Sequence, residues 1–126
     1  MNRRNLRVLV IDDDRSILEV VGIALTERGY DVILADDGAE GLSRVERDQP
    51  DLVILDMVMP RRSGMTVLEK LKQWGPHSPR VIVLSASDHP KQREFAMNCG
   101  AEAFLSKPVD IDVVADQVDL LLSKSS

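Results

Sequence analysis

Three carboxylates stand directly after apolar segments of this sequence, where they could act together. Asp12 and Asp13 follow the apolar residues 6–11, and Asp56 follows the apolar residues 52–55. Carboxylates that lie close together repel one another and resist ionisation, and a hard divalent cation relieves that repulsion. Mg²⁺ prefers oxygen ligands and keeps several waters, so two or three carboxylates are enough to hold it. The pattern predicts a site for Mg²⁺, for which Mn²⁺ would substitute.

Helix capping is the alternative use of these acids. Asp14 is expected to be the N-cap of the helix that follows it, and Asp12 and Asp13 taken alone fit capping and metal binding equally well. Asp56 favours the metal, because Pro60 separates it from the next helix and leaves it no evident capping role. We therefore interpret the carboxylates that follow the two apolar segments as a group.

A hydroxyl and an ammonium group lie at the ends of two further apolar segments. Ser85 closes residues 81–84, and Lys107 lies just beyond residues 103–105, held extended by Pro108. Either residue alone would be interpreted as a turn serine or a solvated lysine. Together with the carboxylates they predict a site that handles a phosphoryl group, because cations neutralise its oxygens and a carboxylate can attack its phosphorus. Which carboxylate attacks stays open at this point.

The apolar segments themselves predict buried strands. Short continuous runs rich in valine and isoleucine are typical of strands covered on both faces, as in a parallel sheet. Such runs occur at residues 6–11, 32–35, 52–55, 81–84 and 103–105. Ligands of open parallel sheets bind beyond the carboxyl ends of the strands, which is where the polar residues stand.

Between these runs the apolar residues have helical spacing. The expected buried faces are Ile17, Val20, Val21, Ala24 and Leu25; Ala39, Leu42 and Val45; Val67, Leu68, Leu71 and Trp74; and Ile111, Val114, Val118 and Leu121. A weaker helix is expected over 91–98. Gly29, Gly75 and Gly100 mark helix ends, and Asp110 is expected to cap the last helix. The alternation predicts an α/β fold, a doubly wound five-stranded parallel sheet with helices on both faces.

The composition excludes several classes of protein. The 126 residues carry 16 Lys and Arg against 21 Asp and Glu, a net charge of −5, whereas a nucleic-acid-binding domain is normally basic. Aromatic residues are only 3% of the chain, and the single cysteine excludes a disulfide framework. The apolar runs are far shorter than the roughly 20 residues that span a membrane, and the first residues are not a secretory signal. We expect one cytoplasmic domain over residues 1–126, with 123–126 as a frayed end and with no nucleic-acid or membrane contact.

Four short motifs in order resemble the receiver domain of two-component response regulators. The first is Val8–Asp14, an apolar strand with its acidic residues, and the second is Leu52–Pro60. The third is Val83–Ala86, which contains the hydroxyl group, and the fourth is Phe104–Pro108, which contains the lysine. Each motif is weak alone, but the four in this order are specific, and the resemblance covers residues 6–122.

The resemblance implies a flavodoxin-like (βα)5 fold with strand order 2-1-3-4-5 and a phosphoacceptor role for Asp56. The phosphoryl group would come from a phosphohistidine of a sensor histidine kinase or of a histidine phosphotransfer protein. Mg²⁺ would bind to Asp13, to Asp56 and to the backbone carbonyl of Val58, and Asp12 would act mainly through bound water. Such a chain is a signalling switch and not an enzyme, because it catalyses only its own phosphotransfer and dephosphorylation.

The resemblance also implies roles for residues at the ends of the fourth and fifth strands. Lys107 would pair with the phosphoryl group, Ser85 would swing to hydrogen-bond it, and Phe104 would turn inward into the space that Ser85 vacates. Pro108 is expected to follow a cis peptide bond. Ser85 and Phe104 stand where many members of the family have threonine and tyrosine, so any readout that needs a phenol oxygen is lost.

Output is expected to pass through the surface of the last helix. Val113 and Leu120 fall opposite its expected core face and are flanked by Gln117. Scattered surface apolar residues are the alternative interpretation. The functional interpretation is a docking or dimerisation patch for an unknown downstream protein or a second copy of the chain, on the side of the fourth helix, fifth strand and fifth helix.

Two other functions stay open. A phosphohydrolase of the haloacid dehalogenase type would use Asp12 as its nucleophile, since Asp12-x-Asp14, Ser85 and Lys107 superficially fit its first motifs. That enzyme needs a further acidic pair after a later strand. The phosphohydrolase interpretation also leaves Asp56 without a role. The second alternative is a pseudo-receiver, a binding module that is never phosphorylated.

Overall fold

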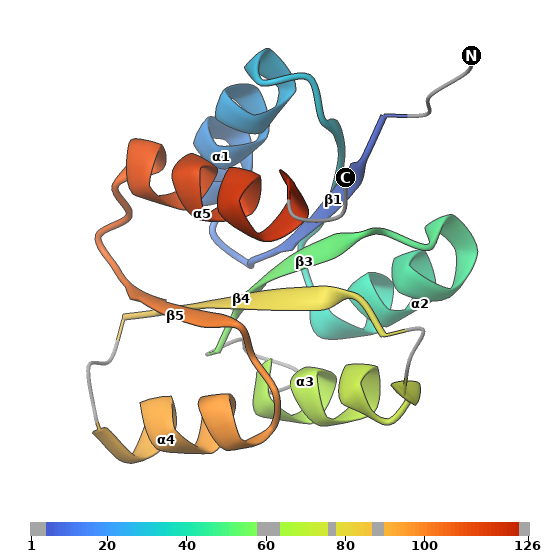
Figure 1. Ribbon diagram of the computed structural model, residues 1–126, viewed down its shortest axis with the longest axis vertical. Helices are drawn as coiled ribbons and strands as arrows, with labels where there is room; N and C mark the ends of the chain where they lie inside the picture. The colour runs from blue at the N-terminus through green and yellow to red at the C-terminus, as the bar shows by residue number, and fades with distance from the viewer. Residues whose placement is uncertain (1–4, 58–63, 76–77, 87–89, 124–126) are drawn as a thin grey trace.

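The computed structural model describes residues 5–57, 64–75, 78–86 and 90–123. Within these ranges five strands alternate with helices and form one parallel sheet in the order β2-β1-β3-β4-β5 (Figure 1). In chain order the elements are β1 (Arg7–Ile11), α1 (Arg15–Glu27), β2 (Asp31–Ala35), α2 (Gly38–Asp48), β3 (Leu52–Asp56), α3 (Gly64–Lys72), β4 (Arg80–Ser85), α4 (Pro90–Asn98), β5 (Ala103–Ser106) and α5 (Ile111–Ser123). The predicted fold class and strand order are confirmed.

The helices cover both faces of the sheet and create two hydrophobic cores. The helices α1 and α5 lie on one face, and α2, α3 and α4 lie on the other (Figure 1). Neighbouring side chains of a strand point to opposite faces. Val8 and Val10 of β1 therefore enter the core under α1 and α5, whereas Leu9 and Ile11 enter the other, and all four are fully buried. Burial on both faces explains why this strand is a continuous apolar run in the sequence.

The register of the sheet brings the carboxyl ends of its inner strands to one edge. Ile11 of β1 pairs with Leu55 of β3, and Leu55 pairs with Val83 of β4. At the end of β4, Ser85 pairs with Ser106 of β5. Because the strands are parallel and nearly in step, the residues that follow each of them are neighbours in space.

Both predicted aspartate caps are confirmed. Asp14 is the N-cap of α1, and its carboxylate accepts hydrogen bonds from the hydroxyl of Ser16 at 2.6 Å and from the N–H of the same residue at 2.9 Å. These hydrogen bonds favour the ionised form and lower the pKa of Asp14. Before α5, Asp110 accepts from the N–H groups of Asp112 and Val113 at 3.0 and 3.3 Å. The caps satisfy donors that the first turn of a helix leaves without a partner.

Three side chains expected in the core are on the surface instead. Val20 of α1 is 42% exposed, because the buried stripe of that helix consists of Leu18, Val21 and Leu25 and leaves Val20 at its side. Trp74 is 39% exposed, since α3 ends at Lys72 before reaching it. Ala39 in the first turn of α2 is also exposed. The predicted buried faces therefore lie on the correct sides of their helices, but they include residues that are exposed.

The prediction that every strand is buried on both faces is wrong for β2. This strand is at the edge of the sheet and pairs only with β1. Its residue Leu34 is 43% exposed, and Asp31 is exposed as well. An edge strand has a neighbour on one side only, so one flank of its side chains stays open to solvent.

The predicted frayed end falls mostly on residues that lie outside the described ranges. Ser123 is the last residue of α5, and residues 124–126 are outside those ranges. Within the residues that the structure describes, no helix combines the length and the apolar character needed to cross a membrane.

Candidate functional site

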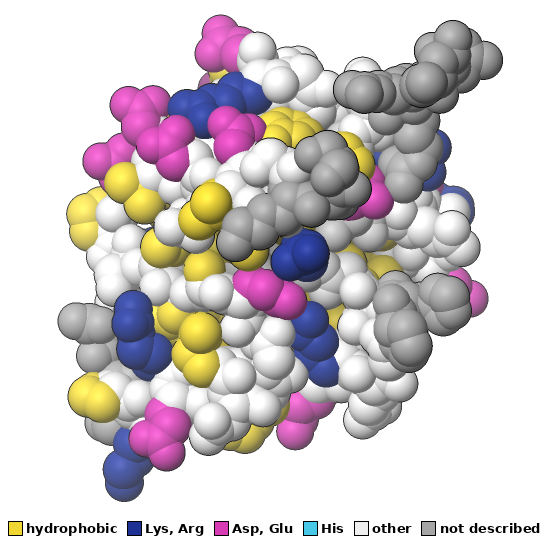
Figure 2. All heavy atoms as spheres, in the orientation of Figure 1, with side chains coloured by type: hydrophobic (Ala, Val, Ile, Leu, Met, Phe, Trp, Pro, Cys, Tyr) yellow, Lys and Arg dark blue, Asp and Glu magenta, His cyan; other side chains and the backbone are white. Residues whose placement is uncertain are grey.

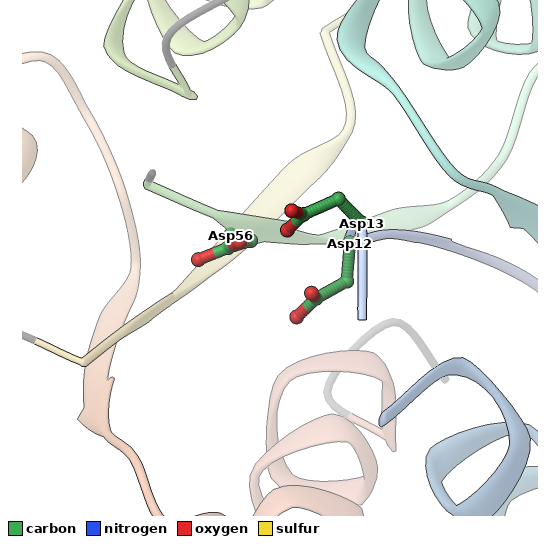
Figure 3. A group of neighbouring side chains, drawn as sticks. All are labelled: Asp12, Asp13 and Asp56. Atoms are coloured by element: carbon green, nitrogen blue, oxygen red, sulfur yellow. The ribbon is translucent and has the colours of Figure 1, made fainter. Parts of the chain in front are cut away.

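Three carboxylates converge at the carboxyl edge of the sheet. Asp12 and Asp13 follow β1, and Asp56 is the last residue of β3. One carboxylate oxygen of each residue lies within 4.8 Å of the other two. Figure 3 shows Asp12 and Asp13 at the end of β1 and Asp56 beside them at the end of β3. Asp12 is fully buried and Asp56 is 3% exposed, whereas Asp13 is exposed, so the group opens to solvent on one side.

The two buried aspartates are anchored through their backbone. The Asp12 N–H donates to the Ala35 carbonyl at 3.1 Å, and the Asp12 Oδ1 accepts from the Asp14 N–H at 2.9 Å. Asp56 lies in the ladder opposite Leu84 of β4. The sheet therefore holds the backbone of both residues, and the start of α1 holds the carboxylate of Asp12.

Lys107 is the cation of the site. Its Nζ lies 3.0 Å from Asp12 Oδ2 and 3.5 Å from Asp56 Oδ1. Its backbone N–H donates to the Ser85 carbonyl at 2.8 Å, which ties the end of β5 to the end of β4. Burial lowers the pKa of Lys107, but the facing carboxylates of Asp12 and Asp56 raise it by more, so the net change is upward. The lysine is therefore charged at neutral pH.

The charge balance of the site fits a divalent cation. Three carboxylates and one ammonium leave a formal charge of −2, and two of the carboxylates are buried, where unbalanced charge is costly. Carboxylate oxygens are the donors that Mg²⁺ and Mn²⁺ prefer. Val58, whose backbone carbonyl is expected to be a further ligand, lies outside the described residues. The residues that are described fit the predicted metal.

Ser85 and Phe104 flank this site from β4 and β5. Ser85 is fully buried, and its hydroxyl donates to Gln92 Oε1 of α4 at 3.4 Å. Phe104 is 4% exposed and packs in the core under α2, α3 and α4, so its ring is already turned inward. The peptide bond between Lys107 and Pro108 is cis.

Sequence reasoning missed two residues of α4 that contact this pair. Gln92 accepts the hydrogen bond from Ser85, and Arg93 lies over the ring of Phe104. The local pattern carries no signal for these contacts, because α4 is only weakly amphipathic and no spacing rule relates it to β4 or β5. They arise only from the way that the helix packs on the sheet.

The expected output residues lie on the outer surface of α5. Val113 is 43% exposed and Leu120 is 51% exposed, and Gln117 between them is half-buried. Figure 2 shows hydrophobic side chains over α5, next to a group of acidic and basic ones. At the surface of α5, Asp119 pairs with Arg28, the C-cap of α1, whose guanidinium lies 2.6 Å from a carboxylate oxygen of Asp119. The apolar patch is therefore exposed and borders on charge.

Known proteins share both the sequence and the fold. Residues 8–119 match the family described as the response regulator receiver domain. The response regulator MprA of Mycobacterium leprae is 37% identical over 120 residues, which are 95% of this chain and 52% of that protein. MprA of Mycobacterium bovis (strain BCG) is 36% identical over 121 residues, 96% of this chain and 52% of that protein. The chain thus spans about half the length of these curated relatives.

Solved structures agree with this match. A CheY-like response regulator receiver domain protein from Methanospirillum hungatei JF-1 has a TM-score of 0.90 and 28% identity, and the match covers 96% of each chain. The receiver domain of the Francisella response regulator 1452 has a TM-score of 0.89 and 30% identity, and the match covers 97% of this chain and all of that one. A CheX–CheY–BeF3–Mg²⁺ complex from Borrelia burgdorferi has a TM-score of 0.85 and 28% identity, over 92% of this chain and 88% of that one. The chain therefore belongs to the response regulator receiver domain family, the signalling switches of two-component systems.

Proposed function

We propose that this chain accepts a phosphoryl group on Asp56 from a phosphohistidine of a sensor histidine kinase or a histidine phosphotransfer protein. It would do so with bound Mg²⁺ and act as a phosphorylation-controlled switch in the cytoplasm. The observation that carries the proposal is the convergence of Asp12, Asp13 and Asp56, together with the ammonium of Lys107 against Asp12 and Asp56. Membership of the receiver family supports the same role.

Asp56 is proposed as the nucleophile because it ends an inner strand beside both the other acids and the ammonium. One of its carboxylate oxygens forms a bond to phosphorus while the phosphorus–nitrogen bond of the phosphohistidine breaks. The imidazole leaves with the bonding electron pair and takes up a proton. Attack of water on the phosphorus of the acyl phosphate would then release inorganic phosphate and restore the carboxylate.

The acidic residues are proposed to contact the metal in different ways. Asp13 and Asp56 would bind Mg²⁺ directly, together with the backbone carbonyl of Val58, and Asp12 would act through bound water. When bound, the cation neutralises the phosphoryl oxygens as they approach the carboxylates. Mn²⁺ would substitute for it. The Mg²⁺ in the related Borrelia burgdorferi complex supports this choice of metal.

Lys107 and Ser85 are proposed to hold the transferred group. Lys107 Nζ is already 3.5 Å from Asp56 Oδ1 and can pair with a phosphoryl oxygen with little movement. Ser85 would exchange its hydrogen bond to Gln92 for one to a phosphoryl oxygen. This exchange couples the phosphorylation of Asp56 to α4.

Incubation with a small acyl phosphate donor and Mg²⁺ tests the proposal. We expect one phosphoryl group on Asp56, located by peptide mass spectrometry, and no adduct in the Asp56→Asn variant. The Asp36→Asn variant is the matched control, because Asp36 is an exposed aspartate just beyond β2 and its removal should leave labelling unchanged. Label on Asp12 with turnover of phosphate esters would establish the phosphohydrolase instead, and the absence of label on any aspartate would establish the pseudo-receiver.

The exposed residues Val113 and Leu120 of α5, with the half-buried Gln117 between them, are proposed as part of the output surface. Replacing Val113 and Leu120 by lysine should abolish self-association or binding of the downstream protein by the phosphorylated chain, because two charges would replace the apolar contact. Analytical ultracentrifugation and a pull-down with the phosphorylated form measure this. Phosphorylation of Asp56 should be unchanged.

A variant with lysine at Val20 and Ile23 is the control for this surface. These residues are 42% and 54% exposed on α1, so the change removes a similar apolar surface at another place. If the α5 variant associates and binds as the unchanged chain does, the patch on α5 has no part in output.

A further inference from the structure

Arg93 of α4 contacts Phe104 of β5 in two ways. The guanidinium carbon of Arg93 lies 5.4 Å from the centroid of the Phe104 ring. The guanidinium also donates a hydrogen bond from Nη2 to the backbone carbonyl oxygen of Phe104 at 3.2 Å. One side chain thus restrains both the ring and the strand that carries it.

The contact between the Arg93 guanidinium and the Phe104 ring is energetically favourable. A cation within about 6 Å of a ring centroid is drawn to the negative face of the ring, and arginine is the usual partner. Phe104 is only 4% exposed, whereas Arg93 as a whole is an exposed residue whose guanidinium covers the ring. The contact favours the buried orientation of the ring.

The helix α4 buries little of its own surface against the sheet. Within α4, all of which the structure describes, Ala96 is the one buried residue. Phe95 and Met97 are 36% and 43% exposed. A helix that buries so little apolar surface depends more on its polar contacts for its position on the sheet. The next residue toward the N-terminus, Gln92, accepts the hydrogen bond from Ser85.

We propose that Arg93 is a positioning residue that holds the Phe104 ring inward and ties α4 to β5 before any phosphoryl group arrives. The consequence for switching rests on the function proposed above. Phe104 is not the moving part of this switch, because its ring already occupies the inward position. The moving contact is the hydrogen bond between Ser85 and Gln92, and α4 responds when it breaks.

Nuclear magnetic resonance of the resting chain tests the role of Arg93. The chain has two phenylalanines, so ¹³C-labelled phenylalanine reports on Phe95 and Phe104 alone, and a Phe95→Leu variant assigns the signals. Broadening by a soluble paramagnetic agent then measures the exposure of each ring. In Arg93→Ala we expect the population with an exposed Phe104 ring to rise about tenfold, the order of change that loss of one cation–π contact and one hydrogen bond produces.

Two further variants separate positioning from a general effect of charge. Arg93→Lys keeps a cation near the ring but loses the planar guanidinium group, so the Phe104 ring in this variant should be protected to an intermediate degree. Lys91→Ala removes one charge from an exposed position of the same helix and should leave the ring as protected as in the unchanged chain. A Phe104 ring that stays fully protected in Arg93→Ala, or is exposed equally in Lys91→Ala, would overturn the proposal.

Adding Mg²⁺ and beryllium fluoride, which mimics a phosphoryl group, tests the consequence for switching. The protection of the Phe104 ring should stay unchanged, while the amide signals of Ser85 and Gln92 shift. If the Phe104 ring becomes more protected when Mg²⁺ and beryllium fluoride are added, the ring does move. That result would contradict the proposal that the ring is already inward in the resting chain. If no amide signal near Asp56 changes, the proposed phosphoacceptor function fails, whereas the comparison of resting variants still decides the role of Arg93.

Discussion

Replacing Lys107 by methionine is expected to lower the free energy of unfolding by about 3 kcal/mol in the absence of divalent cations, because it leaves buried carboxylates without their cation. Asp12 is fully buried and Asp56 is 3% exposed, and the ammonium of Lys107 lies 3.0 and 3.5 Å from their oxygens. Methionine keeps much of the length of the lysine side chain and removes the ammonium, with its charge and its hydrogen bonds to the carboxylates. Urea denaturation monitored by circular dichroism measures the loss.

Magnesium should restore part of this stability. A cation that binds only the folded chain stabilises it by mass action, and the methionine variant offers three carboxylates with no competing ammonium. The gain in unfolding free energy on adding Mg²⁺ should therefore be larger for Lys107→Met than for the unchanged chain. Chelation with EDTA should reverse it.

Lys72→Met is the matched control for this variant. Lys72 is also mostly covered and lies 3.5 Å from Glu102 Oε1, but it is at the end of α3, away from the acidic cluster. We expect a smaller loss of stability and no response to Mg²⁺, because Glu102 is 28% exposed and keeps contact with water. If the two variants lose the same stability and neither responds to Mg²⁺, the buried carboxylates are not what Lys107 neutralises.

The stability that Lys107 contributes should depend on pH in a way that follows from the pKa of its ammonium. Burial lowers this pKa, and Asp12 and Asp56 raise it by more, so the folded-state value lies above the ordinary value of 10.5. A group whose pKa is raised on folding contributes its stability fully below the unfolded-state pKa and loses it as the pH rises through the folded-state pKa. The difference in unfolding free energy between the unchanged chain and Lys107→Met should therefore be constant near neutral pH and shrink above pH 10.5. A difference that grows with alkaline pH would contradict the ion pairing.

Gly64→Ala is expected to destabilise the chain by about 3 kcal/mol, at the upper end of the cost of overpacking, and to slow phosphoryl acceptance by Asp56. An ideal Cβ on Gly64 would lie 2.6 Å from the Cα of Met57 and would clash with the carbonyl oxygen of Asp56. Both are backbone atoms at the end of β3 and cannot rotate away. The Gly64 N–H also donates to the Met57 carbonyl at 3.0 Å, which holds the start of α3 against the site.

Urea denaturation and the rate of labelling by a small acyl phosphate measure the two effects of Gly64→Ala. Gly22→Ala is the control, because its Cβ would meet the side chain of Leu34 at an ordinary 3.5 Å. Alanine is favoured over glycine inside a helix by up to about 1 kcal/mol, so this variant should be neutral or more stable. Equal stability and equal labelling in both variants would show that the close approach at Gly64 does not constrain the site.

The convergence of the carboxylates was predictable from local sequence. Asp12, Asp13 and Asp56 each follow an apolar run, and parallel strands end at one edge of their sheet, so their proximity needs only the strand assignment. The caps at Asp14 and Asp110 were predictable for a similar reason, because a cap involves residues only two or three positions apart.

Burial at the boundaries of the elements was not predictable in this way. Val20 and Trp74 continue the apolar spacing of their helices, yet Val20 lies beside the stripe that meets the sheet and Trp74 lies beyond the end of α3. Leu34 lies in an apolar run like the others, but β2 is at the edge of the sheet. Whether an apolar side chain is covered depends on which element lies next to it, and periodicity alone does not contain that information.

By itself, the sequence determined the fold class, the strand positions and the identity of the acidic, hydroxyl and cationic groups, since these depend on residue type and short-range spacing. Only the tertiary structure decided how the groups are paired. It places the ammonium of Lys107 nearer to Asp12 than to Asp56, and it places Arg93 over the ring of Phe104. Such pairings depend on how a helix or a loop packs against the sheet, and that packing results from contacts between residues far apart in the chain.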